Sequence, residues 1–314
     1  MRTVVTGGCG FIGSHVVDAL TEAGHEVVVV DSVITKLNPA AEYRQADILD
    51  LAGLTAALDG GEVVFHLAAA ADVEQVTADP VRALRLNVEG TGNALEAARR
   101  TGMNRFVLAS TVWVYGAAHA DSEGGDAELT EEVPFDLRRS GHLYVATKLA
   151  AEMAVQSYRE LYGQHFTILR YGIPYGPRMR DALVVARFVR AAREGQPITI
   201  AGTGEQQRNY VYVEDLADAH VRALAPAAAG QTLALEGGAP VSVREIADTV
   251  CSLVRPVRVE HVPARTADYE GIPVSGRLAK ELLDWAPVTP FAEGVRRYLN
   301  WLEAGAGRPE GSGL

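Results

Sequence analysis

Apolar positions in the first 172 residues form short unbroken runs that alternate with longer helical patterns. The runs are rich in β-branched residues and stay apolar through their middle instead of alternating with polar residues, as expected of strands covered on both faces. The runs are residues 3–6, 26–31, 62–68, 105–110 and 167–172. The helical patterns between them are residues 11–24, 80–100 and 144–163, two of which close on glycine, at Gly24 and Gly163.

This alternation predicts a parallel sheet with right-handed crossovers, that is, an α/β fold of the Rossmann type with a doubly wound sheet. After residue 172 the rhythm loosens, because prolines and glycines interrupt the pattern and the helices become shorter. We therefore expect a dinucleotide-binding domain at 1–172 and a smaller α/β substrate lobe at 173–304, with a segment at about 208–225 returning to the first domain. The last residues, 305–314, have linker composition, which predicts a disordered tail.

Charge and composition exclude several classes of protein. The net charge of −11 argues against nucleic acid as a partner, although it leaves room for a small phosphorylated ligand. No apolar run approaches the roughly 20 residues of a membrane helix, and the first strand begins too early to leave room for a signal peptide. Cys9 and Cys251 lie far apart and match no metal spacing, and no HExxH motif is present. We expect a cytoplasmic protein without a metal site.

The glycine-rich stretch TGGCGFIGSH (6–15) lies directly between the first strand and the first helix. Gly8, Gly10 and Gly13 fit G-x-G-x-x-G, and Gly7, Gly10 and Gly13 fit G-x-x-G-x-x-G. A plain tight turn would also use glycines. In this context, however, glycines let the backbone approach a pyrophosphate at the positive end of the helix. The stretch therefore predicts dinucleotide binding.

Two acids bear on which dinucleotide binds. Asp31 closes the second strand 18 residues after Gly13, where a carboxylate can accept hydrogen bonds from the adenosine ribose. Since Ser32 and Val33 supply no cation for a 2′-phosphate, the sequence favours NAD over NADP. Asp47, after the expected third strand, is a candidate for the adenine amino group, and a turn or helix-cap role fits its spacing equally well.

HLYVATK (142–148) places Tyr144 and Lys148 one turn apart on one helical face, in a chain with three lysines and 26 arginines. An ordinary surface pair would show the same spacing. For a tyrosine to act as a base near pH 7, its pKa must fall by about 3 units, roughly 4 kcal/mol. One ammonium about 4 Å away supplies about that much at an effective dielectric constant near 20. Ser110 or Thr111, at the end of the fifth strand, would add a hydroxyl partner for the reacting oxygen.

The order of glycine loop, strand-end acid, strand-end hydroxyl and Tyr-x-x-x-Lys resembles the extended short-chain dehydrogenase/reductase family, in its nucleotide-sugar epimerase/dehydratase branch. The resemblance covers nearly the whole chain. Segments that look like signatures of the branch are HLAA (66–69), NVEGTGNALEAA (87–98), LRYGIPYGPR (169–178), RNYVYVEDLADAH (208–220) and LLDWAP (282–287).

The resemblance implies a role for each matching residue. Tyr144 would be the base, Lys148 would hold the nicotinamide ribose and lower the tyrosine pKa, and Thr111 would be the catalytic hydroxyl, since it stands four residues before Tyr115. It also implies a homodimer. The implied NAD contacts are Gly7, Gly10, Phe11, Ile12, Gly13, Asp31, Asp47, Ile48, Leu67, Ala68, Ala69, Asn87, Tyr144 and Lys148. The implied contacts to a nucleotide sugar are Thr111, Tyr144, Arg178, Arg180, Arg208 and Arg265.

The residues after Thr111 favour one reaction within the branch. Dehydratases and decarboxylases of the branch carry acids there, whereas this chain has Val112 and Trp113, which move no proton. The resemblance then implies a 4-epimerase, which oxidises a sugar carbon and returns the hydride to the opposite face. A ketoreductase or atypical dehydratase, and a non-catalytic NAD-binding regulator, stay open as alternatives.

Two departures from the family pattern concern the sugar. Ile173 replaces the usual Asn, and RRSGHLY lacks the Pro usually found before the catalytic Tyr. Uronate 4-epimerases have a basic Gly-Pro-rich segment at GPRMRD, so Arg178 or Arg180 is a candidate for binding a sugar carboxylate. Surface arginines are the alternative for Arg208 and Arg265.

Overall fold

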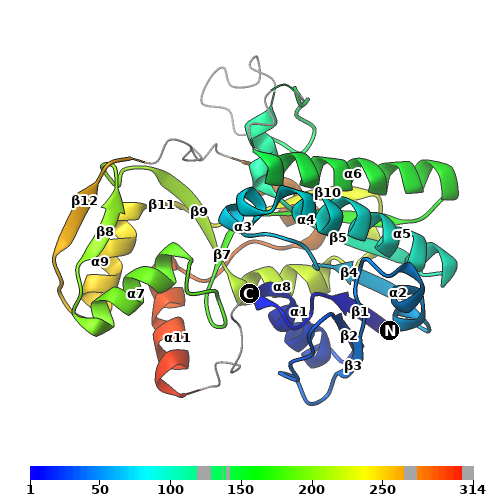
Figure 1. Cartoon of the computed structure of the whole chain (residues 1–314), viewed down its shortest axis with the longest axis horizontal. Coiled ribbons are helices and arrows are strands. Elements are labelled where there is room, and N and C mark those ends of the chain that lie inside the picture. Colours follow the sequence, from blue (N-terminus) through cyan, green and yellow to red (C-terminus); the bar gives the residue numbers. More distant parts are fainter. Residues whose placement is uncertain (119–128, 137, 139–141, 265–273, 306–314) are drawn as a thin grey trace.

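The computed structural model describes residues 1–118, 129–136, 138, 142–264 and 274–305, and it divides them between a large sheet with its helices and a smaller group of strands and helices (Figure 1). The large sheet has seven parallel strands in the order β10-β6-β5-β4-β1-β2-β3. Because β1 pairs with both β2 and β4, the winding reverses at β1, and ligands of such sheets bind at the carboxyl ends of the strands beside this point. The strands are β1 (Arg2–Thr6), β2 (Glu26–Asp31), β3 (Glu42–Gln45), β4 (Val63–His66), β5 (Arg105–Thr111), β6 (Phe166–Tyr171) and β10 (Gln231–Leu235).

Helices cover both faces of this sheet, which is why its strands are apolar without alternation. In β1, Val5 contacts the apolar cluster under α1 and α8, while Val4 contacts the cluster under α2, α5 and α6. Successive side chains of a strand point to opposite faces, so each strand needs apolar residues at adjacent positions. The helices are α1 (Phe11–Glu22), α2 (Leu51–Leu58), α5 (Gly90–Arg100), α6 (Leu143–Tyr162) and α8 (Val213–Arg222).

The segment predicted as one helix over 80–100 contains a π-helical turn, Arg85–Glu89, between α4 (Pro80–Leu84) and α5. Asp79 caps the start of α4, and Pro80 occupies the first turn of this helix, where both residue types are favoured. The buried side chain of Asn87 lies inside the π turn. Its amide oxygen accepts a hydrogen bond from the backbone N–H of Ala70 at 2.7 Å, and its amide nitrogen donates to the Ala70 carbonyl at 2.9 Å. Such turns often occur at functional sites. A short helix, α3 (Val73–Ala78), precedes the segment.

The smaller group lies at one end of the large sheet (Figure 1) and has its own apolar core. It contains a three-stranded sheet in the order β11-β9-β7 and a two-stranded sheet of β12 and β8. Its strands are β7 (Ile173–Tyr175), β8 (Ile198–Ala201), β9 (Gln207–Tyr212), β11 (Pro240–Ser242) and β12 (Val259–Val262). Its helices are α7 (Val184–Glu194), α9 (Val243–Leu253) and α11 (Phe291–Glu303).

The chain crosses between the two groups more often than the sequence predicted. β10, which we had expected in the substrate lobe, is the edge strand of the large sheet. Of the segment expected to return at 208–225, α8 packs on α1, whereas β9 belongs to the smaller sheet. A further helix, α10 (Arg277–Leu283), packs against β10. Of the predicted tail, residues 306–314 lie outside the described part of the chain.

Asp215 in α8 joins the two groups. Its buried carboxylate accepts hydrogen bonds from the backbone N–H of Val288 and of Thr289, at 3.1 and 2.9 Å, and from the Thr289 hydroxyl at 2.9 Å. These bonds fix the segment that leads into α11.

Replacing Asp215 with alanine should therefore destabilise the protein. Three donors lose a charged acceptor in a buried place, so we expect the free energy of unfolding to fall by about 3 kcal/mol. Asp218 lies one helical turn after Asp215 and forms an exposed ion pair with Arg222. Asp218→Ala should therefore change the free energy of unfolding by less than about 0.5 kcal/mol. Urea denaturation followed by circular dichroism measures both. Equal effects of the two substitutions would show that the Asp215 bonds do not hold the groups together.

Candidate active site

The glycine loop between β1 and α1 is packed too tightly for side chains. Gly7 has a φ of +72°, and a Cβ there would stand 2.7 Å from the backbone nitrogen of Ala68. A Cβ on Gly13 would stand 2.1 Å from the carbonyl oxygen of Gly7. Gly10, which precedes α1, has no side chain, so it offers no capping acceptor to the first N–H groups of the helix. This bare helix start fits a pyrophosphate, as the sequence predicted.

Asp31 reaches the glycine loop from the end of β2. Its carboxylate accepts hydrogen bonds from the backbone N–H of Cys9, at 3.1 Å, and of Val33, at 3.4 Å. Burial raises the pKa of Asp31, and these backbone donors oppose the rise. The carboxylate thus links the strand end to the loop on which a dinucleotide would lie.

The other expected NAD contacts gather around the same edge of the sheet. Exposed Asp47 accepts from the backbone N–H of Leu49 at 2.9 Å, which is the turn role that the sequence had left open. Ile48 is buried against Gly90, and the side chain of Asn87 accepts a hydrogen bond from the backbone N–H of Ala70. Phe11 and Ile12, in the first turn of α1, and Leu67, Ala68 and Ala69, in the loop after β4, are partly exposed.

Thr111, Tyr144 and Lys148 come together where β5 ends beside α6. The Thr111 oxygen accepts from the backbone N–H of Trp113 at 3.2 Å, and the Thr111 side chain hydrogen-bonds Tyr144. The ammonium nitrogen of Lys148 lies 5.9 Å from the ring centroid of Tyr144 and donates to the carbonyl of Ala109 at 3.0 Å. The sequence had predicted this cluster from residues 33 positions apart.

The electrostatics of the cluster differ from the expectation. Burial raises the pKa of Tyr144 to about 12, against the charge of Arg180 and the Thr111 hydrogen bond, which lower it. Burial also lowers the pKa of Lys148 to about 8, against the charge of Glu152. Lys148, which we had expected to lower the tyrosine pKa, is not among the groups that do so, because with a pKa of about 8 it loses its charge before the phenol ionises.

A buried ion pair lies behind Lys148. Arg170 in β6 donates to Glu152 in α6 at 2.7 and 3.1 Å, and the hydroxyl of Ser110 donates to the same carboxylate at 2.5 Å. Arg170 and Glu152 are only 4% and 6% exposed. Lys148 and Glu152 are one helical turn apart on α6. The ion pair of Arg170 and Glu152 therefore fixes the face of α6 that carries the catalytic candidates.

The arginines proposed for the substrate lie in different places. Arg178, with a φ of +63°, donates to Asp18 at 2.7 Å, and its Nη1 is buried without a partner among the described residues. Arg180 pairs with Asp72 at 2.8 Å and, as its effect on the Tyr144 pKa shows, lies near the phenol. Arg208 lines a cavity, and Arg265 lies outside the described residues.

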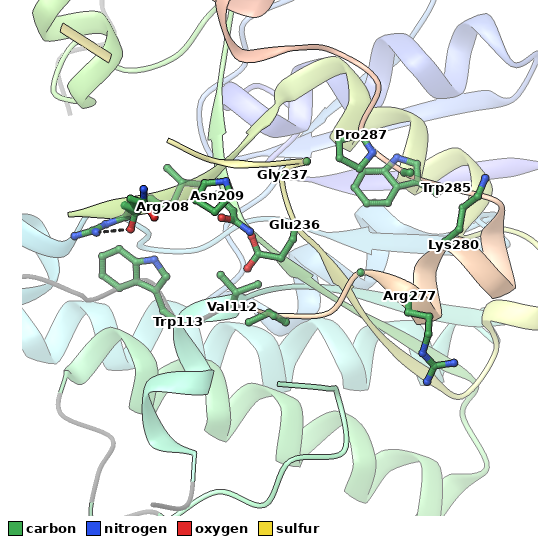
Figure 2. Close-up of a pocket in the computed structure, with 17 residues that line it drawn as sticks. Val112, Trp113, Arg208, Asn209, Glu236, Gly237, Arg277, Lys280, Trp285 and Pro287 are labelled. Atoms are coloured by element: carbon green, nitrogen blue, oxygen red, sulfur yellow. Dashed lines mark hydrogen bonds between the residues drawn. The ribbon is translucent and has the colours of Figure 1, made fainter. Parts of the chain in front are cut away.

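The cavity beside the cluster has a volume of about 430 Å³. Figure 2 shows Val112 and Trp113 on one side of it and Arg208, Asn209 and Glu236 on the other. The ring of Trp113 also packs edge-on against Tyr144, with centroids 6.3 Å apart. One aromatic side chain therefore connects the cavity to the phenol.

Sequence reasoning had not identified Glu152, Arg170 or Glu236. A charged residue inside the apolar run TILRYG, and a glutamate four positions after Lys148, were signals for the buried pair. Glu236 stands in EGGAP and resembles an ordinary turn acid in sequence.

Comparison with known proteins agrees with this geometry. The model of the "NAD dependent epimerase/dehydratase family" matches residues 3–234, and the chain belongs to this family. The fold and the resemblance predicted from the sequence are confirmed. NAD as the cofactor is confirmed as well. The protein is accordingly an enzyme of the NAD-dependent epimerase/dehydratase type.

Individual relatives are nucleotide-sugar enzymes. The chain is 36% identical to the UDP-glucose 4-epimerase of Mycolicibacterium smegmatis, over 95% of this chain and 97% of that protein. It is 31% identical to a probable UDP-glucuronate 4-epimerase of Rhizobium meliloti, over 96% and 97%. Among solved structures, the UDP-glucose 4-epimerase of Thermotoga maritima with UDP-glucose superposes with a TM-score of 0.87 at 30% identity, over 98% of this chain and 100% of that one.

Removing one partner of the buried pair should be costly. Arg170→Met leaves Glu152 buried without its cation, so we expect the free energy of unfolding to fall by about 3–5 kcal/mol. The double substitution Arg170→Met and Glu152→Met removes both charges and should recover most of that loss. Urea denaturation compares the two. A double variant as unstable as the single one would contradict the electrostatic explanation.

Asp31 should control the choice of cofactor. Asp31→Asn removes a carboxylate that accepts from ribose hydroxyls and repels a 2′-phosphate. We expect NAD binding to weaken about tenfold or more and the preference for NAD over NADP to shrink. Calorimetric titration with each dinucleotide measures this, with Asp59→Asn, an exposed acid at the end of α2, as the control. An unchanged preference would remove Asp31 from the cofactor site.

Proposed function

We propose that the protein is an NAD-dependent 4-epimerase of a UDP-linked sugar. The observation that carries this proposal is the cluster of Thr111, Tyr144 and Lys148 at the end of β5, in a chain that belongs to the epimerase/dehydratase family. Relatives named as 4-epimerases, at 36% and 31% identity over nearly the whole chain, support the reaction and the UDP group.

In this proposal Tyr144 takes the proton of the C4 hydroxyl and later returns it. The Thr111 hydroxyl bonds the reacting oxygen, and its backbone bond from Trp113 holds its orientation. NAD, when bound, supplies the hydride acceptor and, in its oxidised form, a positive charge. Lys148 holds the cofactor ribose through the same ammonium that meets Ala109.

The phenol needs nearby positive charge to work as a base. With a pKa of about 12, Tyr144 is almost wholly protonated at neutral pH. Each unit by which the pKa falls multiplies the ionised fraction by ten. Arg180 is already a lowering influence on this pKa, so we assign it to the tuning of the base in addition to any contact with substrate.

The neighbours of Thr111 favour epimerisation over elimination or decarboxylation. Val112 is buried, and Trp113 packs against the rings of Tyr144 and His142. Neither side chain exchanges a proton with a sugar carbon. The keto form of the sugar therefore has no acid or base from these positions to divert it before the hydride returns.

We also infer that two copies associate through α6. Met153 and Leu161, about two turns apart on this helix, are 60% and 70% exposed. Large apolar side chains exposed toward one side of a helix fit an interface between subunits.

Tyr144→Phe should abolish turnover while preserving the fold. The loss of general base catalysis should lower kcat by about 10²–10⁴-fold, whereas Tyr162→Phe on the same helix should stay within about twofold of the wild type. Conversion of UDP-glucose to UDP-galactose, and of UDP-glucuronate to UDP-galacturonate, measures the activity. Loss of NADH in equal amount to a keto-sugar, without epimerisation, would establish a ketoreductase instead.

A further inference from the structure

Glu236, directly after β10, is a buried acid with an incomplete set of hydrogen bonds. Glu236 is 6% exposed, and its carboxyl accepts hydrogen bonds from the backbone of Gly237 and from the side chain of Asn209. The oxygen Oε2 is buried and has no hydrogen-bond partner among the described residues. Figure 2 shows this side chain extending toward Val112, inside the cavity.

The fold makes room for this carboxyl. A Cβ on Gly172, between β6 and β7, would stand 2.9 Å from Oε2 of Glu236. Any larger residue at 172 would push the carboxyl away or out of the cavity. The absence of a side chain at Gly172 thus leaves the space that the Glu236 carboxyl occupies.

Glu236 faces the part of the cavity nearest to the reacting groups. Val112 and Trp113, which line it, follow Thr111 directly, and Trp113 packs against Tyr144. A sugar whose C4 hydroxyl meets Tyr144 would therefore present its other substituents toward this cavity. An unsatisfied buried polar atom there is costly unless a ligand completes its bonds.

We propose that Glu236 is a specificity residue that hydrogen-bonds the sugar of the substrate and, once ionised, selects a neutral hexose over a hexuronate. This rests on the proposed function, and it narrows the substrate class of the same site.

The selection follows from which groups can satisfy Oε2. A sugar hydroxyl donates and accepts, so it completes the bonds of Glu236 in either protonation state. A sugar carboxylate only accepts, so it suits Glu236 only while Glu236 carries a proton. Burial raises the pKa of Glu236 to about 8, against the bonds from Gly237 and Asn209. A hexuronate is therefore rejected more strongly as the pH rises through about 8.

The surrounding charges are compatible with this selection. The cations that line the cavity are Arg208 on β9 and Arg277 and Lys280 on α10, of which Arg277 pairs with Glu281 and Lys280 with Asp284. Arg180, the earlier candidate for a carboxylate, is already paired with Asp72. A sugar carboxylate would have to compete with Asp72 for it.

The test measures binding of UDP, UDP-glucose and UDP-glucuronate by calorimetry on the NAD-loaded protein, from pH 6.5 to 9. We expect the wild type to bind UDP-glucose more tightly than UDP across this range. Its affinity for UDP-glucuronate should fall about tenfold between pH 7 and pH 9, since the ionised fraction of a group with a pKa near 8 rises by about that factor.

Glu236→Gln cannot ionise and has nearly the same shape. It should abolish the fall with pH and raise the ratio of UDP-glucuronate to UDP-glucose affinity at pH 9 about tenfold, whereas Glu194→Gln, at the exposed end of α7, should behave as the wild type. Gly172→Ala, which crowds the carboxyl, should shift the ratio in the same direction. Equal affinities for the two sugars in the wild type at pH 9, or a pH dependence that survives Glu236→Gln, would overturn the proposal.

Failure of the proposed function would look different. Without epimerase turnover of any UDP-sugar, the 4-epimerase assignment would fall, while the binding preference would still report on Glu236. Turnover of both sugars with no preference between them would support the 4-epimerase assignment and contradict the role of Glu236 in selection.

Discussion

The buried pair of Glu152 and Arg170 is the interaction on which the active site depends. It joins α6, which carries Tyr144 and Lys148, to β6, and through Ser110 to β5, which carries Thr111. The pair thereby holds α6 and β6, which are consecutive in the chain, in register with the more distant strand β5. Because both charges are withdrawn from water, neither can leave the other without a large loss of free energy, so the arrangement is rigid. The proposed catalytic groups, Thr111, Tyr144 and Lys148, are carried on these rigidly held elements.

Burial has a second consequence, which bears on the proposed base. The same low-dielectric surroundings favour the neutral phenol of Tyr144 and the neutral amine of Lys148. In the proposed mechanism, Tyr144 therefore stays protonated unless positive charge lies beside it. Arg180, in the segment after β7, is one such charge. Geometry is fixed in advance, and ionisation depends on the local charge.

The sequence predicted the central strands and the glycine loop well because these depend on local pattern. Residues 3–6 and 26–31 lie in strands with nearly those bounds, and Gly163 ends α6 with a positive φ as expected. The strand β10 was missed because TLAL sits among prolines and glycines, and what makes it a strand is pairing with β6, 64 positions earlier. Glu236 and the Glu152–Arg170 pair were missed for a similar reason. Their meaning comes from partners that only the folded chain brings near.

The position of β10 at the edge of the large sheet also sets an order of events during synthesis. Strand β6 is complete at residue 171, yet the strand that covers its outer edge ends at residue 235. At about 5–20 residues per second, a ribosome needs roughly 3–13 s to make the intervening chain. Through that interval the nascent protein presents a row of unpaired backbone groups, which invites pairing with other chains. A chaperone that shields this edge would be of most use to the protein during those seconds.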